Sequence, residues 1–263
     1  MELTTLLGII VGLAAVVGAM IFKGISFGVL INPAAFCVIL VGTVATILNS
    51  YPGKNLKSIG SLFKVLMTKQ KGINEVEIYK LMVELSITAR REGLLALEKK
   101  VEDIDDPFVI KGINMITLGL AGDVIEEILE TEIDAMEKRH EINASIFSSA
   151  GTYAPTLGVL GAVFGLIAAM AHIDDTDLMA EAIAAAFIAT VLGIFTGYVL
   201  WHPFAKKLKV KSQEEVILKN MIMIGLLSIQ KGDSPAIVKE RLLAVLPPQK
   251  QKKIVEEVES ESE

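Results

Sequence analysis

The sequence has 263 residues, of which 52% are hydrophobic, and a mean hydropathy of +0.55. Such an apolar composition excludes an ordinary soluble globular domain and indicates a membrane protein with a soluble part. The formal net charge of −6 does not define a partner, because membrane proteins distribute charge by side of the bilayer, and nothing in it indicates nucleic-acid binding.

Two apolar segments near the start predict a transmembrane hairpin that occupies residues 1–48. The spans are 3–22 and 29–48, joined by a six-residue turn, and each has about the 20 residues that a helix needs to cross the hydrocarbon core. Asn32 and Pro33 are placed in the first turn of the second span. The first span lacks a basic leader, so no cleavable signal peptide is expected. The one cysteine, Cys37, lies inside an apolar run and excludes an intrachain disulfide.

Residues 49–152 are predicted to form a helical cytoplasmic domain. A basic amphipathic stretch at 56–69 is followed by Asn74, a plausible N-cap, and by a helix expected to run to about residue 101. The sequence DIDDP at 103–107 interrupts it. A further amphipathic helix at 124–142 is expected to continue toward the third span.

A second apolar hairpin, residues 153–203, is the most distinctive part of the chain. Its predicted spans, 153–171 and 182–201, are free of Asp, Glu, Lys, Arg and His, and a turn with Asp174, Asp175 and Asp177 joins them. These acids either attract cations to a channel mouth or solvate a turn. A titratable group at depth is normally required for ion transport, so any ion path needs an acid supplied by another chain.

The remaining segment, 204–263, predicts cytoplasmic helices at about 206–230 and 236–246, followed by a charged tail expected to be disordered. The distribution of basic residues determines the topology. Those near the span ends are Lys54, Lys57, Lys64, Lys138, Arg139, Lys206, Lys207, Lys209 and Lys211, whereas the two short turns hold only Lys23. Both termini are therefore expected in the cytoplasm.

No enzyme chemistry is indicated. The chain has no phosphate-binding loop and no HExxH motif, and its histidines lack metal-ligand spacing. We expect no enzyme activity, metal or cofactor. The fold class that follows is all-α: a polytopic membrane protein with four transmembrane helices and a helical cytoplasmic domain.

Several residues have both a structural and a functional interpretation. The Thr156 and Thr190 hydroxyls either line an ion path or bond a carbonyl one turn earlier in their own helix. Pro155 and Pro203 either mark the membrane boundaries or act in coupling. Arg90 and Glu98, eight residues apart and so expected on one helix face, either belong to a solvated surface or contact a partner.

Three motifs resemble the flagellar-motor stator subunit family that includes MotA and the sodium-type PomA. They are RREGLLALE at 90–98, YAPTLGVLGAVFGLI at 153–167 and IATVLG followed by a proline in span four. The resemblance covers nearly the whole chain. It implies a bacterial inner-membrane protein that forms a pentameric ring around a MotB-like partner, whose single transmembrane helix carries an essential Asp.

The resemblance also implies roles for individual residues. Arg90 and Glu98 match the charged residues that engage the rotor protein FliG. Pro155 and Pro203 match the prolines that link ion passage to conformational change, and Thr190 matches the threonine facing the ion path.

The coupling ion is expected to be the proton. Sodium-type relatives carry threonine where this chain has Ala162 and Ala189, and two fewer hydroxyls leave fewer oxygen ligands for a sodium ion. The alternatives are a sodium-type stator, an ExbB/TolQ-like energiser ring, for which three spans are expected, and a non-conducting membrane scaffold. A secondary transporter would require inverted repeats or a charged midplane site, and neither is visible.

Overall fold

The computed structural model describes residues 2–68 and 74–260, and all regular structure in these two ranges is helical. Four helical segments are long and apolar enough to cross a membrane: Leu3–Lys23, Phe27–Ser50, Gly122–Ala171 and Thr176–Lys231. The predicted all-α fold with four spans is therefore confirmed. The chain divides into two compact units, Met1–Gln70 with His140–Val210 and Lys71–Arg139 with Lys211–Glu263.

The first span, α1, runs from Leu3 to Lys23 and ends at Gly24, whose positive φ of 68° closes the helix. The second span is irregular. After the 3₁₀ turn η1 (Phe27–Leu30), it consists of α2 (Pro33–Phe36), the π-helical turn η2 (Cys37–Val41) and α3 (Gly42–Ser50). Helical structure therefore begins at Phe27, two residues before the predicted start of the span, and its α-helical part begins later. The Asn32 side chain accepts a hydrogen bond from the N–H of Ala35, so the α-helix begins at Pro33.

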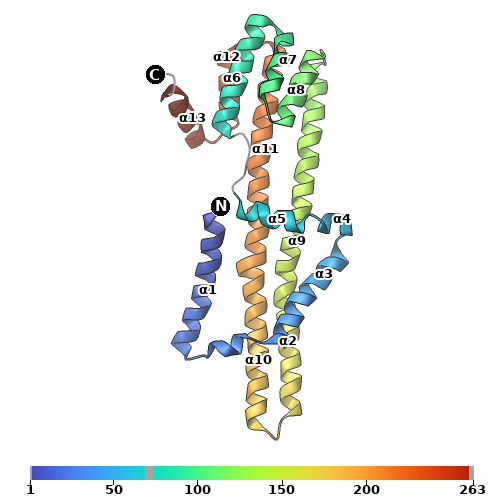
Figure 1. Cartoon of the computed structure of the whole chain (residues 1–263), viewed down its shortest axis with the longest axis vertical. Helices are drawn as coiled ribbons and strands as arrows, with labels where there is room; N and C mark the ends of the chain where they lie inside the picture. Colours follow the sequence, from blue (N-terminus) through green and yellow to red (C-terminus); the bar gives the residue numbers. More distant parts are fainter. Residues whose placement is uncertain (1, 69–73, 261–263) are drawn as a thin grey trace. The chain divides into compact units, whose positions relative to one another are not determined.

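Two long helices form the second hairpin (Figure 1). Helix α9 extends over 50 residues, Gly122–Ala171, and confirms that the helix at 124–142 continues into the third span. Helix α10 (Thr176–Phe195) begins six residues before the predicted 182, because the Asp175 carboxylate caps it by accepting the N–H groups of Asp177 and Leu178.

The helix that forms the fourth span is not broken at Pro203. A π-helical turn, η5 (Thr196–Trp201), leads directly into α11 (His202–Lys231), and Pro203 is the second residue of α11. A proline disrupts the turn before it, because it lacks an N–H and crowds the carbonyl four residues earlier. The wider π turn lies where that disruption falls, so the helix continues where the sequence predicted a break.

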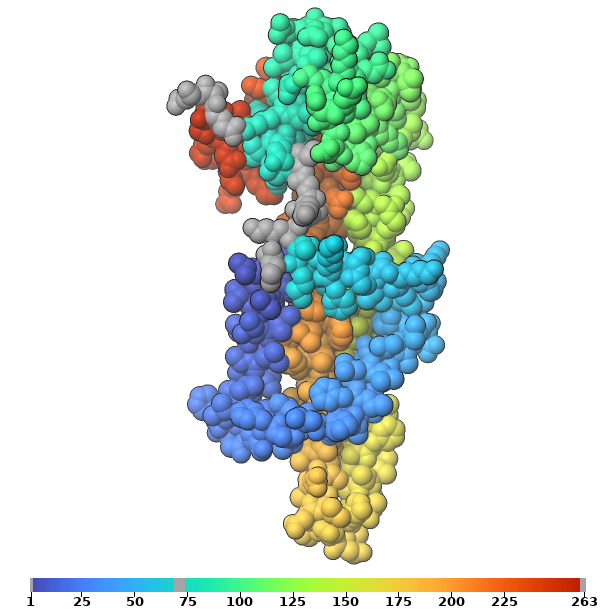
Figure 2. All heavy atoms as spheres, viewed as in Figure 1, coloured from blue at the N-terminus to red at the C-terminus, as the bar shows by residue number. Residues whose placement is uncertain are grey.

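Short helices α4 (Gly53–Leu56) and α5 (Ile59–Met67) follow the second span and pack within the same unit. Phe63, Phe147, Trp201 and Phe204 form an aromatic cluster with ring centroids 5.3–6.5 Å apart. In Figure 2, α1 and the second span lie over one side of the α9–α10 hairpin, and the tip of the hairpin projects beyond them. The peripheral spans therefore cover only part of the hairpin.

The other unit surrounds a single apolar core. It contains α6 (Glu75–Glu92), η3 (Leu94–Ala96), α7 (Leu97–Lys100), η4 (Val101–Asp103), α8 (Pro107–Thr117), α12 (Pro235–Ala244), α13 (Pro248–Ser260) and the adjoining parts of α9 and α11. Asn74 is confirmed as an N-cap, because it forms a capping box with Glu77.

Two predictions in this unit are wrong. The helix from Asn74 does not reach residue 101, because α6 ends at Glu92 and Gly93 adopts φ 86° and ψ 164°, a conformation available almost only to glycine. The charged tail is helical up to Ser260. Its α13 buries Ile254 in the core, and Lys250 forms an ion pair with Glu75 of α6, so an apolar anchor and a charge pair order a segment that composition alone marks as disordered.

Candidate functional site

Glycine residues bring α9 and α10 into backbone contact along the hairpin. A Cβ atom at Gly158 would lie 2.8 Å from the carbonyl oxygen of Ala189, and one at Gly193 would lie 2.8 Å from that of Ala154. Further along, a Cβ at Gly165 would meet the Ala186 methyl at 2.7 Å. Real Cβ atoms do not approach so closely, so these positions require glycine and the two helices pack as one rigid pair.

We call this close contact between α9 and the helix of the fourth span the helix seam. It also links Pro155 to the turn that precedes Pro203. Pro155 lies inside α9 and has no N–H, so the carbonyl of Gly151 lacks its usual helical donor. Gly197, in the η5 turn that precedes Pro203, fills the space beside that carbonyl. A Cβ at Gly197 would lie 2.7 Å from the Gly151 oxygen and 2.8 Å from Cγ and Cδ of Pro155. The backbone irregularities of the third and fourth spans are therefore in direct contact.

The two threonines occupy different environments. Thr156 is exposed, and its hydroxyl donates a hydrogen bond to the Tyr153 carbonyl at 2.7 Å. Thr190 is half-buried, and its hydroxyl lies 3.5 Å from the Ala186 carbonyl, the outer limit of a hydrogen bond. Both hydroxyls therefore point back along their own helices, and that of Thr190 is only weakly held.

The two alanines at the positions where sodium-type relatives are expected to carry threonine lie at or near the helix seam. Ala189 is buried, with its methyl 3.1 Å from where a Cβ of Gly161 would be, and Ala162 is half-buried. A threonine in place of Ala189 would have to fit its extra atoms against α9.

The acidic turn of the hairpin has a defined structural role. Asp175 caps α10, Asp177 lies in the first turn of that helix, and all three aspartates are exposed. Carboxylates at a helix N-terminus are stabilising, so two of the three acids are accounted for by the helix they begin.

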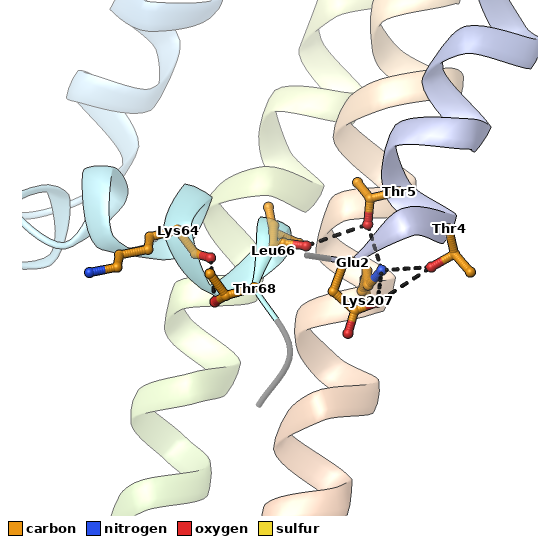
Figure 3. A network of polar contacts seen from close by, with 7 residues as sticks. All are labelled: Glu2, Thr4, Thr5, Lys64, Leu66, Thr68 and Lys207. Carbon is orange, nitrogen blue, oxygen red and sulfur yellow. Dashed lines mark hydrogen bonds and ion pairs between the residues drawn. The ribbon is translucent and has the colours of Figure 1, made fainter. Parts of the chain in front are cut away.

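A polar network that the sequence did not predict joins three helices of the same unit (Figure 3). The Lys207 ammonium lies 2.8 Å from a Glu2 carboxylate oxygen and also donates hydrogen bonds to the Thr4 and Thr5 hydroxyls. Thr5 in turn donates to the Leu66 carbonyl, and the Glu2 N–H donates to the Met67 carbonyl. The N-terminus of α1 is thereby bonded to the C-terminus of α5 and to the first turns of α11. No sequence signal pairs Glu2 with a residue 205 positions away.

The RREGLLALE segment lies in the other unit and is not a continuous helix. Gly93 separates Arg90, in α6, from Glu98, in α7, so the expectation that both share one helix face is wrong. Both side chains are exposed, and neither has an ion pair within the described part of the chain. The neighbouring Lys100 forms an ion pair with Glu84 at 2.6 Å. The side chain of Leu95, which lies between Arg90 and Glu98 in the sequence, is 70% exposed. The segment is a short surface turn that presents unpaired charges of both signs.

Within residues 2–68 and 74–260, no three or more His, Cys, Asp or Glu side chains are grouped in a way that could hold a metal ion. The residues that the structure brings together here form a helical wall with hydroxyl groups and prolines.

Comparisons with known proteins agree with this architecture. A family model described as the MotA/TolQ/ExbB proton channel family matches residues 100–221. Motility protein A of Bacillus subtilis (strain 168) is 47% identical over 262 residues, covering 100% of this chain and 97% of that protein. Among solved structures, the flagellar MotAB stator complex from Bacillus subtilis has a TM-score of 0.89 at 48% identity and covers 95% of this chain and 98% of its own. MotAB of C. jejuni has a TM-score of 0.89 at 31% identity, with 94% and 97% covered.

The fold, the hairpin seam and the family match together define a membrane ion-channel subunit of the MotA/TolQ/ExbB class. Identity across the whole chain narrows this class further. The chain belongs to the motility protein A family, and it is homologous to MotA of the flagellar MotAB stator. The resemblance inferred from the three motifs is thereby confirmed.

Proposed function

We propose that this chain forms a ring with a MotB-like partner, conducts protons at the interface with that partner and converts proton flow into torque on the flagellar rotor. The observation that carries the proposal is the α9–α10 hairpin. Its two apolar stretches, 154–171 and 182–201, contain no acid or base apart from the phenol of Tyr198. Such a wall requires a titrating carboxylate from another chain, and the solved relatives are complexes of MotA with MotB.

The mechanism follows from the wall and the linked prolines. A proton enters from outside and neutralises an acid on the partner helix close to Thr190 and Thr156. Neutralisation of this acid changes which subunit of the ring the partner helix packs against most favourably. Pro155 contacts Gly197 in the turn before Pro203, so a displacement of the third span is transmitted directly to the start of α11. A charge crossing 100 mV supplies about 2.3 kcal/mol for this step.

The topology and the rotor contact belong to the same proposal. Both termini and the α6–α8 region face the cytoplasm, because lysines and arginines gather at the inner ends of the second, third and fourth spans, whereas the two short turns hold only Lys23. Arg90 and Glu98 contact the rotor protein FliG. Their exposure supports this, and so does the absence of an ion pair to either side chain among residues 2–68 and 74–260, since such charges are available for complementary charges on a partner.

The proton is favoured over sodium because Ala162 and Ala189 provide no oxygen ligands. The test is ion flux into vesicles that contain this protein with its MotB-like partner, compared with a partner whose membrane Asp is replaced by Asn, with any plug segment removed from both. Proton uptake that requires the Asp and is independent of sodium supports the proposal. Sodium-dependent uptake would retain the stator and overturn the coupling ion, and absence of Asp-dependent flux from a verified complex would favour a non-conducting scaffold.

A further inference from the structure

His202 lies at the point where the backbone irregularities of the two hairpin helices meet. Its imidazole packs on Gly151, where a Cβ would come within 2.7 Å of the ring atoms Cγ and Cδ2 and 2.9 Å of Nδ1. Gly151 is the residue whose carbonyl Pro155 leaves without a helical donor, and Pro203 follows His202 directly. The space that the ring occupies therefore exists because residue 151 is a glycine.

The π-helical turn determines which face of the helix carries His202. Twelve residues separate it from Thr190, which in a regular α-helix would place the two side chains about 120° apart around the axis. The π turn at 196–201 absorbs about one extra residue, so the separation resembles that of eleven α-helical residues, about 20°. Thr190 and His202 therefore share one face of the fourth span, about 16 Å apart along the axis.

The surroundings of His202 contain few competing charges. The Tyr198 ring stacks on the imidazole with centroids 5.2 Å apart, and Lys206 is exposed one turn further along. On α9, residues 143–171 include no ionisable group other than Tyr153, and the nearest charged residue before them is Glu141, ten residues from Gly151. On the adjoining turn of α11, the Lys207 ammonium is bonded to Glu2.

We infer that His202 is the proton-transfer group at the inner end of the ion path, carrying protons released on the Thr190 face to the cytoplasm. This rests on the proposed proton-conducting function. Histidine is the side chain whose ordinary titration range spans physiological pH, and its two ring nitrogens allow a proton to enter at one and leave at the other. In each transfer an O–H bond of a hydronium ion breaks as one N–H bond forms on the neutral imidazole, and the other N–H bond of the imidazolium then breaks as an O–H bond forms on a water molecule on the inner side.

The test compares proton flux through the complete complex with its partner in the wild type and in His202→Gln, which keeps a polar side chain but does not titrate. We expect flux to fall at least about tenfold, because a positioned acid–base group accelerates proton transfer by about a hundredfold or more and water replaces it only in part. We also expect the dependence of the flux on internal pH to disappear, because the glutamine side chain cannot take up and release a proton. Imidazole added on the inner side is expected to increase the flux of the variant and to leave the flux of the wild type unchanged.

Two matched variants separate proton transfer from packing. Tyr198→Phe retains the stacked ring and is expected to keep the wild-type pH profile, and Gly151→Ala crowds the imidazole without removing it. Unchanged flux and pH profile in His202→Gln would overturn the inference. A reduced flux with the wild-type pH profile and no imidazole rescue would also overturn it, because that pattern reports packing alone. Failure of the underlying function is distinguishable, because the wild type itself would then show sodium-dependent flux or none.

Discussion

The Lys207 ammonium lies 2.8 Å from the Glu2 carboxylate, and this contact joins the N-cap residue of α1 to α11. Both side chains are less than a quarter exposed. The ammonium has three hydrogens, and Glu2, Thr4 and Thr5 accept all three. The contact is therefore a saturated polar joint between residues 205 positions apart.

Replacing Lys207 by Met is expected to destabilise the complex by about 1–3 kcal/mol, because the partly buried Glu2 carboxylate then loses its charged donor. The measurement is a double-mutant cycle on thermal unfolding of the purified complex with Glu2→Gln, Lys207→Met and both together. A coupling energy of about 0.5–3 kcal/mol is expected. Strictly additive effects would mean that the two residues do not stabilise each other.

Replacing Gly197 by Ala is expected to disrupt the contact between Pro155 and the η5 turn that precedes Pro203. The added methyl would lie 2.7 Å from the Gly151 oxygen and 2.8 Å from the Pro155 ring, so α9 and η5 must separate, at a cost of about 1–3 kcal/mol. The matched control is Gly18→Ala in α1, where no atom lies within 4 Å of the new methyl. Loss of flux and stability in the first variant only is expected, and equal behaviour of the two would contradict the role of the seam.

Reversing the exposed charges of the RREGLLALE segment at 90–98 is expected to abolish motility without affecting assembly of the complex. Arg90→Glu together with Glu98→Lys would remove the charge complementarity that we propose with the rotor, while neither side chain has an internal ion pair to lose within the described residues. Motility in soft agar and the size of the purified complex are the two readouts. Lys100→Ala, which breaks the neighbouring pair with Glu84, is the control expected to retain motility. A motile double variant would refute the rotor-contact assignment.

Replacing Gly93 by Ala is expected to shift Glu98 relative to Arg90. No atom lies within 4 Å of the new methyl, so the cost comes from backbone strain alone, about 1–3 kcal/mol at φ 86° and ψ 164°. Motility should decline while proton flux persists. Gly119→Ala introduces a methyl at another positive φ, 76°, also in open space, and serves as the control for strain in general. If cells that carry either variant are equally motile or equally impaired, the turn at Gly93 has no specific role in torque generation.

The attachment of α13 is expected to weaken in acid. Burial raises the pKa of the Glu75 carboxyl. The hydrogen bond and charge of Lys250, a backbone N–H and the charge of Lys253 lower it by a larger amount, so the net pKa lies below its ordinary value. A carboxyl with a lowered folded-state pKa stabilises fully above its unfolded pKa, about 4.3, and loses this contribution as pH falls through the folded value. The difference in thermal stability between wild type and Glu75→Gln should therefore be present at pH 7 and decrease below about pH 4.3. A difference independent of pH would exclude this ion pair as its source.

Much of this protein could be read directly from its sequence because the signals are local. Apolar length defined the spans, and Asn74 and the DIDDP interruption defined helix boundaries through side-chain caps and proline geometry that act within a few residues. The motifs at 90–98, 153–167 and 188–193 identified the family. In contrast, the break at Gly93 was missed because the apolar periodicity continues across it, and glycine permits a turn without requiring one.

The tertiary structure alone decided which distant groups meet. Residue 151 must be a glycine because the His202 ring packs on it. Helix α13 is ordered because Ile254 is buried in the core and Lys250 forms an ion pair with Glu75. Lys207 forms its ion pair with Glu2 because α1 lies beside α11. The π turn before Pro203 belongs with these, since it changes which residues share the face of Thr190. Hydropathy and capping act along the chain, whereas these contacts depend on how helices far apart in sequence pack, and that information is not carried by any single segment.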